Sequence, residues 1–299
     1  MRIAAVSDLH YPRSLDWRDG IERFAENVEG IDADVFAFAG DLIDLGYRLD
    51  DVGGTAYNCL SRFDHIRGRK VAALGNHDIW VPPASRKNSA DRIGEMKGIY
   101  HEHGFHLLDT DGPLVVGDVA FVGNVGWYDY SFFPKECPPR GPRKFIDDEK
   151  GEIGWEGIDD GVLSKKMITY VSGGRESRIG WGDGIHIRWK YSDKEMTKML
   201  NERLRADIES VYDDVSKVVV VTHHVPFESL VYRKGETTWD FNNAFMGSRE
   251  TGELLLNYEK AGTVICGHVH RNRKVRNGHI DCHEVSFHPA RTRPVIIEV

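Results

Sequence analysis

The sequence has few cysteines, no long apolar run and no excess of positive charge, and each of these absences excludes a class of protein. Its four cysteines (Cys59, Cys137, Cys266 and Cys282) are widely spaced and form no CxxC pair. A disulfide framework is therefore not expected. The thiols should be reduced, as they are in a reducing compartment.

Membrane and nucleic-acid partners are disfavoured by the same kind of argument. No apolar stretch approaches the roughly 20 residues that cross a bilayer, and the short apolar run from Arg2 to Ser7 does not resemble a signal peptide. A cytoplasmic protein without membrane contact is expected. With a net charge of −8, the chain has no overall positive field that would attract nucleic acid. A nucleic-acid partner is therefore disfavoured, but it stays open as an alternative. Nothing in the sequence indicates an oligomeric state.

Short, uninterrupted apolar runs alternate with helix-like stretches, a pattern typical of buried parallel strands joined by helices. The predicted strands are Ile3–Val6, Val35–Ala39, Val71–Leu74, Val218–Val221 and Thr263–Cys266, with a hairpin at Leu114–Val116 and Val119–Val122. The predicted helices are Trp17–Val28, Asp193–Asp213 and Glu250–Ala261. The tail from Lys274 to Val299 is predicted to form short antiparallel strands. The chain is expected to be a single α/β domain of 299 residues.

Between about residues 131 and 190 the composition changes and this pattern is interrupted. The stretch is rich in Gly, Pro and charged residues, carries Trp155, Trp181 and Trp189, and shows almost no hydrophobic periodicity. Two interpretations stay open. The stretch is either a surface insertion packed by its own aromatic residues or a lid over a cleft, since long loops on α/β scaffolds often carry function.

Five short polar motifs follow the apolar runs in order along the chain. They are Asp8-Leu9-His10, Gly40-Asp41, Gly75-Asn76-His77-Asp78, His223-His224 and Gly267-His268-Val269-His270. Their carboxylate, amide and imidazole groups suit Zn, Mn, Fe or Ni rather than a thiolate site. Since a strand holds the side chain at its end rigidly, we expect the groups to converge at the sheet edge where α/β proteins bind ligands.

Each motif alone has an ordinary explanation. A D-x-H pair occurs by chance, Asn76 and Asp78 favour turns, and a histidine such as His223 is common in a core. Asp41 is harder to explain, because an unpaired buried carboxylate is costly and requires a cation or an ion pair. Five such motifs at five strand ends together predict a site for two metal ions.

The order and spacing of the motifs resemble the signature of the calcineurin-like metallophosphoesterase superfamily: D-x-H, G-D, G-N-H-[DE], H and G-H-x-H. The resemblance spans nearly the whole chain. It implies a four-layer α/β/β/α sandwich of two mixed β-sheets flanked by helices. It also implies hydrolysis of phosphate esters with two divalent or trivalent transition-metal ions (Mn, Fe, Zn, Ni or Co).

The resemblance also implies a metal ligand set. One ion would be held by Asp8, His10, Asp41 and His270, and the other by Asp41, Asn76, His223 and His268.

Four further residues receive supporting roles from the resemblance. A hydroxide bridging the two metals would attack phosphorus, and His77 would protonate the leaving oxygen as general acid. Asp44 and Asp78 would orient these groups, because such sites usually require supporting carboxylates. His224 would support a ligand or face the substrate.

The sequence departs from the motifs of one subfamily, and this departure narrows the range of expected substrates. Serine/threonine phosphatases carry an arginine directly after G-D-x-V-D and another before G-N-H-E, whereas this sequence has Leu45 and Leu74. A phosphoprotein is therefore disfavoured, and a small phosphodiester or phosphomonoester is expected. The alternatives are a nuclease or nucleotide pyrophosphatase with a cationic groove in the insertion, and a non-catalytic scaffold that binds a partner protein.

Two smaller features each leave two interpretations open. Arg140, Arg143 and Lys144 form either a local anion patch or a solvated loop face. Trp127 and Tyr128 either stack on a nucleobase or sugar, or take part in aromatic packing within the insertion.

Overall fold

Two mixed β-sheets pack face to face in the computed structural model, which describes residues 1–44 and 51–299. The first sheet has the order β15-β1-β2-β3-β4, with β1 (Arg2–Val6), β2 (Val35–Ala39), β3 (Arg69–Ala73), β4 (Phe105–Leu107) and β15 (Val295–Glu298). The second has the order β13-β14-β12-β11-β6-β5, with β5 (Leu114–Val116), β6 (Val119–Asn124), β11 (Lys217–Thr222), β12 (Thr263–Cys266), β13 (Arg273–Asn277) and β14 (Ile280–Glu284).

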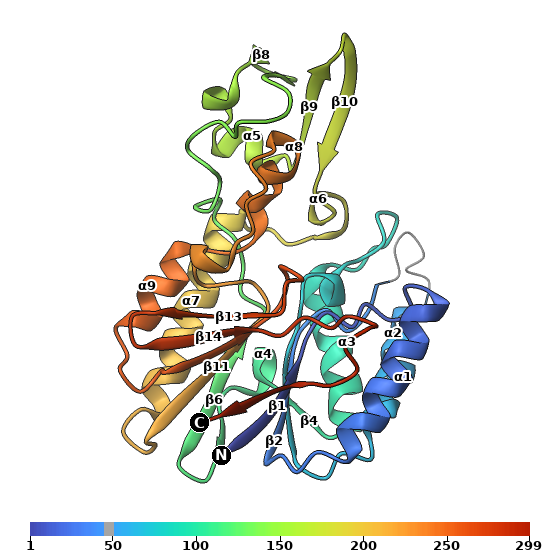
Figure 1. The fold of residues 1–299 in the computed structure, drawn as a ribbon, viewed down its shortest axis with the longest axis vertical. Coiled ribbons are helices and arrows are strands. Elements are labelled where there is room, and N and C mark those ends of the chain that lie inside the picture. The colour runs from blue at the N-terminus through green and yellow to red at the C-terminus, as the bar shows by residue number, and fades with distance from the viewer. Residues whose placement is uncertain (45–50) are drawn as a thin grey trace.

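Helices cover the outer face of each sheet, so the body of the molecule has four layers (Figure 1). The first sheet is covered by α1 (Leu15–Glu29), α2 (Val52–Leu60) and α3 (Ser89–Glu102). The second is covered by α7 (Asp193–Val211) and α9 (Arg249–Leu256). The predicted sandwich of two mixed sheets with flanking helices is confirmed.

The alternation of side chains along each central strand explains the layers. In β11, Val218 and Val220 belong to the cluster that includes α7 and α9, whereas Val219 and Val221 pack between the two sheets. Both faces of such a strand are buried, so its sequence is apolar without interruption. This is why the strands could be recognised from short apolar runs.

The predicted elements agree with the structure, with two exceptions. Strand bounds and the first two predicted helices lie within two residues of the predicted ones. The third predicted helix, α9, ends at Leu256 instead of Ala261, with Asn257 as its C-cap. In the tail, β13 pairs antiparallel with β14 and β15 antiparallel with β1, but β14 also pairs in parallel with β12, which the prediction lacked.

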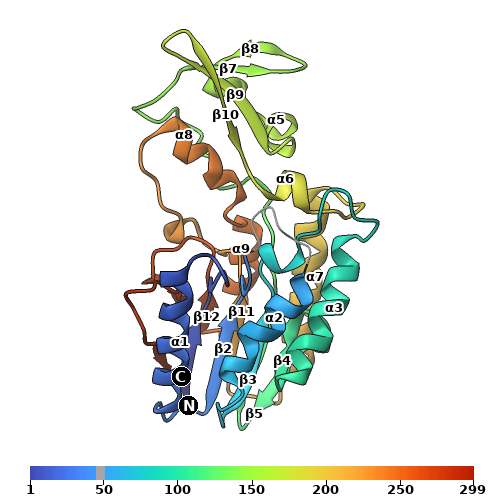
Figure 2. The same ribbon diagram turned by 90° about the vertical axis from the view of Figure 1, so that its right-hand side faces the viewer.

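The insertion forms a third, four-stranded sheet that rises from the two-sheet body (Figures 1 and 2). Its order is β10-β9-β7-β8, with β7 (Lys144–Asp147), β8 (Gly151–Ile153), β9 (Met167–Ser172) and β10 (Arg175–Gly180), followed by α6 (Asp183–His186). Sequence patterning predicted no element here, because these strands are largely exposed. In β10, for example, Ile179 is the one buried residue.

The aromatic residues of the insertion face in two directions. Phe133 stacks on Trp155 within the insertion, with ring centroids 4.6 Å apart. Trp181 instead stacks on Phe245 of the body, at 5.5 Å. The insertion is therefore packed partly by itself and partly against the body. Its movement as a lid, and the single-domain organisation of the chain, stay predictions.

Two bulk expectations can be compared with the structure. All four cysteines are free, and Cys59, Cys266 and Cys282 are buried. Across residues 1–44 and 51–299, no helix is long and apolar enough to cross a membrane. The cytoplasmic location stays a prediction.

Candidate metal centre

The seven predicted ligands lie at one edge of the two sheets, just after the strands that carry them. β1, β2 and β3 run parallel in one sheet, and β11 and β12 run parallel in the other, so their carboxyl ends meet. The ligands are Asp8 and His10 after β1, Asp41 after β2, Asn76 after β3, His223 after β11, and His268 and His270 after β12.

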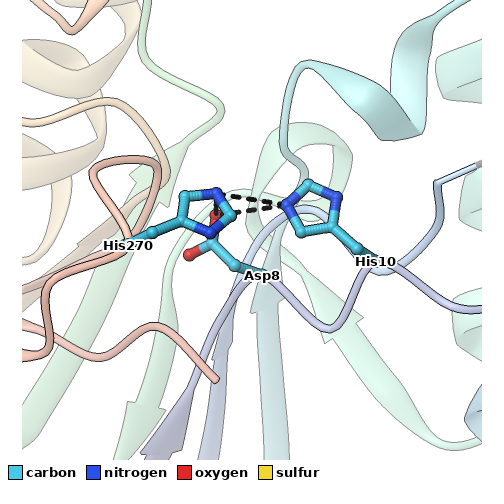
Figure 3. A group of neighbouring side chains, drawn as sticks. All are labelled: Asp8, His10 and His270. Carbon is cyan, nitrogen blue, oxygen red and sulfur yellow. Dashed lines mark hydrogen bonds and ion pairs between the residues drawn. The ribbon is translucent and has the colours of Figure 1, made fainter. Parts of the chain in front are cut away.

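Asp8, His10 and His270 form a first group, in which their polar atoms point toward one another (Figure 3). The Nε2 atoms of His10 and His270 are 3.2 Å apart. Oδ1 of Asp8 lies 3.2 Å from Nε2 of His270 and 3.7 Å from Nε2 of His10. Oδ2 of Asp41 is also close, 3.6 Å from Nε2 of His10.

Asp41, Asn76, His223 and His268 form a second group. Nε2 of His223 lies 3.2 Å from Oδ2 of Asp41, 3.2 Å from Oδ1 of Asn76 and 3.0 Å from Nδ1 of His268. Because Asp41 approaches members of both groups through the same oxygen, Oδ2, it joins the two groups into one site.

Hydrogen bonds to backbone carbonyls show which imidazole nitrogens carry lone pairs. A carbonyl accepts only from an N–H, so Nδ1 of His223 donates to Ala39 at 2.9 Å, and Nε2 of His268 donates to Phe245 at 3.2 Å. The other nitrogen of each neutral ring then carries a lone pair. These two lone-pair nitrogens are the ones that face each other at 3.0 Å.

The donor atoms fit two transition-metal ions. Two lone pairs at 3.0 Å repel each other unless a cation or proton lies between them. Ligand atoms bonded at about 2.0–2.2 Å to one ion lie roughly 3–3.5 Å apart, and the separations in the second group and two of the four in the first fall in this range. Imidazole with carboxylate and amide oxygens is a donor set that Mn, Fe, Zn, Ni and Co all accept.

Buried charge favours cations in the same place. Burial raises the pKa of Asp41, but the neighbouring His223, His77 and His10 lower it further, so the carboxyl group stays ionised. Burial lowers the pKa of His223, but Asp41 and Asp8 outweigh this effect and raise it to about 10, so without a metal ion a proton on Nε2 of His223 takes the place of the cation between the two rings. Burial and the adjacent His224 and His223 lower the pKa of His268, which stays neutral.

Five of the seven predicted ligands have left-handed backbone conformations. Their φ angles are +56° at Asp8, +45° at His10, +58° at Asp41, +73° at His268 and +58° at His270. Residues with a Cβ adopt this region at a cost, and such conformations cluster at functional sites. In the turns after three different strands, these conformations direct the side chains of the predicted ligands toward the candidate metal centre.

Gly75 allows two of these turns to approach closely. A Cβ at this position would lie 2.0 Å from Oδ1 and 2.3 Å from the backbone nitrogen of Asp41. Only glycine fits such a contact, so the turn after β3 can pack directly on the turn after β2.

Asp78 is fully buried and ties backbone segments together. Its Oδ1 accepts N–H groups of Leu42 and Ile43 at 2.9 and 3.3 Å, and its Oδ2 accepts those of Asp41 and Gly75 at 3.0 and 2.8 Å. Burial and Asp41 raise the pKa of Asp78 to about 7, and the backbone bonds oppose this shift. Asp78 therefore lies where it can orient Asp41, although this role stays a prediction.

Asp44 lies beside both His10 and His77. Its Oδ2 is 3.9 Å from Nδ1 of His10, and its Oδ1 is 3.7 Å from Nδ1 of His77. The His77 ring stacks on Trp80, and its Nε2 lies 4.0 Å from Oδ2 of Asp41. Burial lowers the pKa of His77, but Asp41 and Asp44 outweigh this effect and raise it. His77 can therefore carry a proton beside the site, although its proximity to His10 and Asp41 also makes it a candidate ligand.

His224 is buried behind His268, with ring centroids 4.3 Å apart. Its Nδ1 lies 3.1 Å from the carbonyl of Val125, and burial and His223 lower its pKa to about 3. Within the described part of the chain its Nε2 has no hydrogen-bond partner. The structure therefore places His224 against a predicted ligand, and its role stays a prediction.

Trp127 and Tyr128 pack beside His224 and are 1% and 0% exposed. The interpretation that they stack on a nucleobase or sugar is wrong, because no ring face is accessible. The alternative, aromatic packing within the insertion, holds for Trp127, which contacts Trp189, whereas Tyr128 contacts Phe245 outside the insertion.

Asp183, in α6 of the insertion, is a residue that the sequence analysis missed. Its side chain is 1% exposed. Oδ1 accepts from Nδ2 of Asn76 at 2.9 Å and from Nε1 of Trp80 at 2.7 Å, and Oδ2 accepts from Tyr128 and Trp181 at 3.0 and 2.7 Å. Because Nδ2 of Asn76 faces Asp183, Oδ1 of Asn76 faces His223. The insertion thus fixes which atom of Asn76 points into the site.

Substituting Asp183→Asn is expected to weaken metal binding by roughly 10- to 100-fold, the usual effect of losing a group that orients a ligand. The new amide cannot accept from all four donors, so the orientation of Asn76 is no longer fixed. Calorimetric titration of the metal-free protein with Mn²⁺ would measure the change.

Asp193→Asn is a matched control for this experiment. Asp193 is also buried and accepts from a tryptophan and a tyrosine, Trp127 and Tyr130, but it contacts no predicted ligand. Metal affinity should be unchanged in this variant. An equal loss in both variants would show that the effect is a general loss of packing.

Comparisons with known proteins agree with this geometry. Residues 1–272 match the family model described as calcineurin-like phosphoesterase, whereas no curated protein matches the sequence. The fold is similar to that of the phosphopantetheinyl hydrolase PptH from Mycobacterium tuberculosis, with a TM-score of 0.61 and 18% identity over 95% of this chain and 88% of that chain. It is also similar to that of a dimetal phosphatase from Danio rerio, with a TM-score of 0.50 and 12% identity over 96% and 87%. At these identities the solved structures show a shared fold alone. Because the family model covers most of its length, the chain belongs to the calcineurin-like phosphoesterase family and is a metal-dependent phosphoesterase.

Proposed function

We propose that the chain hydrolyses a small phosphodiester or phosphomonoester at the site formed by the two groups that share Asp41. The observation that carries the proposal is the position of Oδ2 of Asp41, 3.2 Å from Nε2 of His223 and 3.6 Å from Nε2 of His10. One carboxylate oxygen can then belong to two metal ions. Such a pair is suited to phosphate esters, whose attacking and leaving oxygens both develop charge.

The ligand roles follow the two groups. One ion would be held by Asp8, His10, Asp41 and His270, and the other by Asp41, Asn76, His223 and His268. Bound there, the ions would supply Lewis acidity toward phosphate oxygens and would lower the pKa of a water molecule. Mn, Fe, Zn, Ni and Co all suit these donors.

The remaining residues act on the orientation of ligands and on protons. Asp183 orients the amide of Asn76, and Asp78 holds the turn that carries Asp41. Asp44 faces Nδ1 of both His10 and His77 and favours a proton on each nitrogen. The raised pKa of His77 allows a second proton on Nε2, and His77, 21% exposed, donates that proton to the leaving oxygen as general acid.

A phosphoprotein substrate receives no support from the described residues. Leu74 is fully buried, and its backbone N–H donates to Asp109 at 2.7 Å, so it presents nothing to a phosphate. Leu45, at the other arginine position, lies outside the described residues.

The nuclease alternative predicts a cationic groove in the insertion. Several basic side chains there are already engaged: Arg140 lies 3.4 Å from Glu236, Arg143 donates to the carbonyls of Pro138 and Pro139, and Lys144 pairs with Glu152 at 2.9 Å. This favours a solvated loop face over an anion patch. The proposal therefore keeps a small substrate.

Hydrolysis of bis(p-nitrophenyl) phosphate and p-nitrophenyl phosphate tests the proposal, first with Mn²⁺ and then with chelator. Chelator-sensitive cleavage of the diester would identify a phosphodiesterase, and cleavage of the monoester alone would identify a phosphatase. Cleavage of neither ester by protein that binds two ions would contradict the proposal and favour the non-catalytic scaffold.

A further inference from the structure

A cavity of about 280 Å³ opens beside the candidate metal centre. It is lined by His268 and His270, one from each ligand group, by Trp181 of the insertion, and by five residues of the segment 232–246: Tyr232, Trp239, Asn242, Asn243 and Met246. Short helix α8 (Thr237–Asp240) lies in this region, between the insertion sheet and the body (Figure 2). A phosphate ester bound at the metal centre would therefore place one ester group in or next to this cavity.

The walls of the cavity are aromatic. Trp181, Tyr232 and Trp239 line it, together with Met246. The rings of Tyr232 and Trp239 meet edge to face with centroids 6.2 Å apart, and Trp239 is 39% exposed. Aromatic surfaces at the edge of a catalytic site favour a flat ring, because stacking is strongest between planar partners.

One polar atom in this wall has no protein partner. Oδ1 of Asn242 is buried, and within the described part of the chain it accepts no hydrogen bond. A buried acceptor without a donor costs free energy, so a ligand that brought an N–H or O–H to this atom would be stabilised. An acceptor among aromatic rings suits a heteroaromatic ring that carries an N–H.

Two cations complete the surroundings of the cavity. The Arg271 guanidinium lies 3.7 Å from the centroid of the Tyr232 ring, and Nζ of Lys234 lies 3.3 Å from that of Trp239. These contacts hold both rings in place through cation–π attraction. Arg271 also directly follows His270, so positive charge lies near the position of the phosphate.

We propose that this cavity binds the base of a nucleoside phosphate ester, with the ring against Trp239 and Tyr232 and a base N–H donated to Oδ1 of Asn242. The inference rests on the proposed function, since it names the organic part of the substrate hydrolysed at the same site. A sugar alone fits less well, because it would bring several hydroxyl groups to a wall that is mostly aromatic.

Three p-nitrophenyl phosphodiesters separate the contribution of the base from that of the sugar, because they share a leaving group and differ in the second ester group. These groups are methyl, a 1-methyl deoxyriboside without a base, and thymidine. With the metal-loaded protein, kcat/KM for the thymidine ester is expected to exceed that for the base-free ester by roughly tenfold, the effect of stacking one base. Equal values for these two esters would overturn the inference.

Two substitutions localise the effect to the cavity. Trp239→Ala removes an exposed ring, and Asn242→Leu removes the unpaired acceptor without leaving a void, so neither should impair folding. Each is expected to lower kcat/KM for the thymidine ester about fivefold to tenfold, through KM, and to leave the methyl ester unchanged. Tyr57→Ala, which removes an aromatic residue of similar exposure (46%) on α2, is the matched control. A base preference that survives both substitutions would overturn the inference.

Failure of the inference and failure of the proposed function give different results. Chelator-sensitive cleavage of the methyl ester supports the function whatever the base preference. If no ester is cleaved, calorimetric binding of thymidine 5′-monophosphate and of orthophosphate still tests the cavity. Tighter binding of the nucleotide, lost in Trp239→Ala, would support it, and equal affinities would overturn it.

Discussion

Replacing Asp41 with asparagine is expected to remove metal binding at both groups and to reduce phosphoester hydrolysis by roughly a thousandfold or more. Oδ2 of Asp41 lies within 3.6 Å of both His10 and His223. Asparagine keeps the shape of the side chain but removes its negative charge. Its NH₂ group would also direct hydrogens at the place of a cation. Elemental analysis after dialysis should give fewer than one ion per chain.

The control for Asp41→Asn is Asp32→Asn, which removes the same charge from an exposed position far from the strand ends that carry the ligands. That variant should retain two ions and normal turnover. Retention of two ions by Asp41→Asn, with turnover close to that of the unmodified protein, would show that Asp41 does not join the groups.

Replacing His77 with alanine is expected to separate catalysis from metal binding. A general acid contributes roughly 10²–10⁴-fold, so turnover of an alkyl ester with a poor leaving group should fall by that factor. A p-nitrophenyl ester should lose far less, because p-nitrophenolate leaves without protonation. Metal content should stay near two ions, as measured by elemental analysis.

The competing role for His77 is that of a ligand. Its Nε2 is close enough to His10 and Asp41 to share an ion with them. Loss of an ion in His77→Ala, or equal losses with good and poor leaving groups, would assign that role instead. Trp80→Phe is a useful companion, because it keeps an aromatic ring under His77 while removing the hydrogen bond from Trp80 to Asp183.

The sequence predicted the body of the fold because its strands are buried on both faces. A run such as Val218–Val221 is apolar at every position since one side meets α7 and α9 and the other meets the first sheet. The same logic predicted the place of the five polar motifs, because a polar residue directly after such a run must lie at the edge of the sheet. Which of these residues are ligands was implied by the family resemblance. Strand β10 has the opposite character, with Ile179 as its one buried residue, so neither alternation nor an apolar run marks it.

Asp183 could not be predicted for a different reason. Its contact with Asn76 joins residues 107 positions apart, through a stretch without periodicity. An aspartate among glycine, tryptophan and other charged residues has many ordinary explanations, and its importance depends on a position in space. The cavity lined by Trp181 and Trp239 is a similar case, because it is assembled from the insertion, from residues 232–246 and from the turn after β12.

At the residues with left-handed backbone conformations at the strand ends, the requirements of metal binding conflict with those of folding stability. Asp8, His10, Asp41, His268 and His270 each hold a conformation that costs on the order of 1 kcal/mol for a residue with a Cβ and nothing for glycine. If all five are metal ligands, selection for catalysis must keep them. In a duplicated gene released from that selection, a glycine at an accessible position such as His270 would relieve strain while it abolished a ligand. Loss of function would then be favoured by folding itself, and inactive descendants of this chain should lose these residues early.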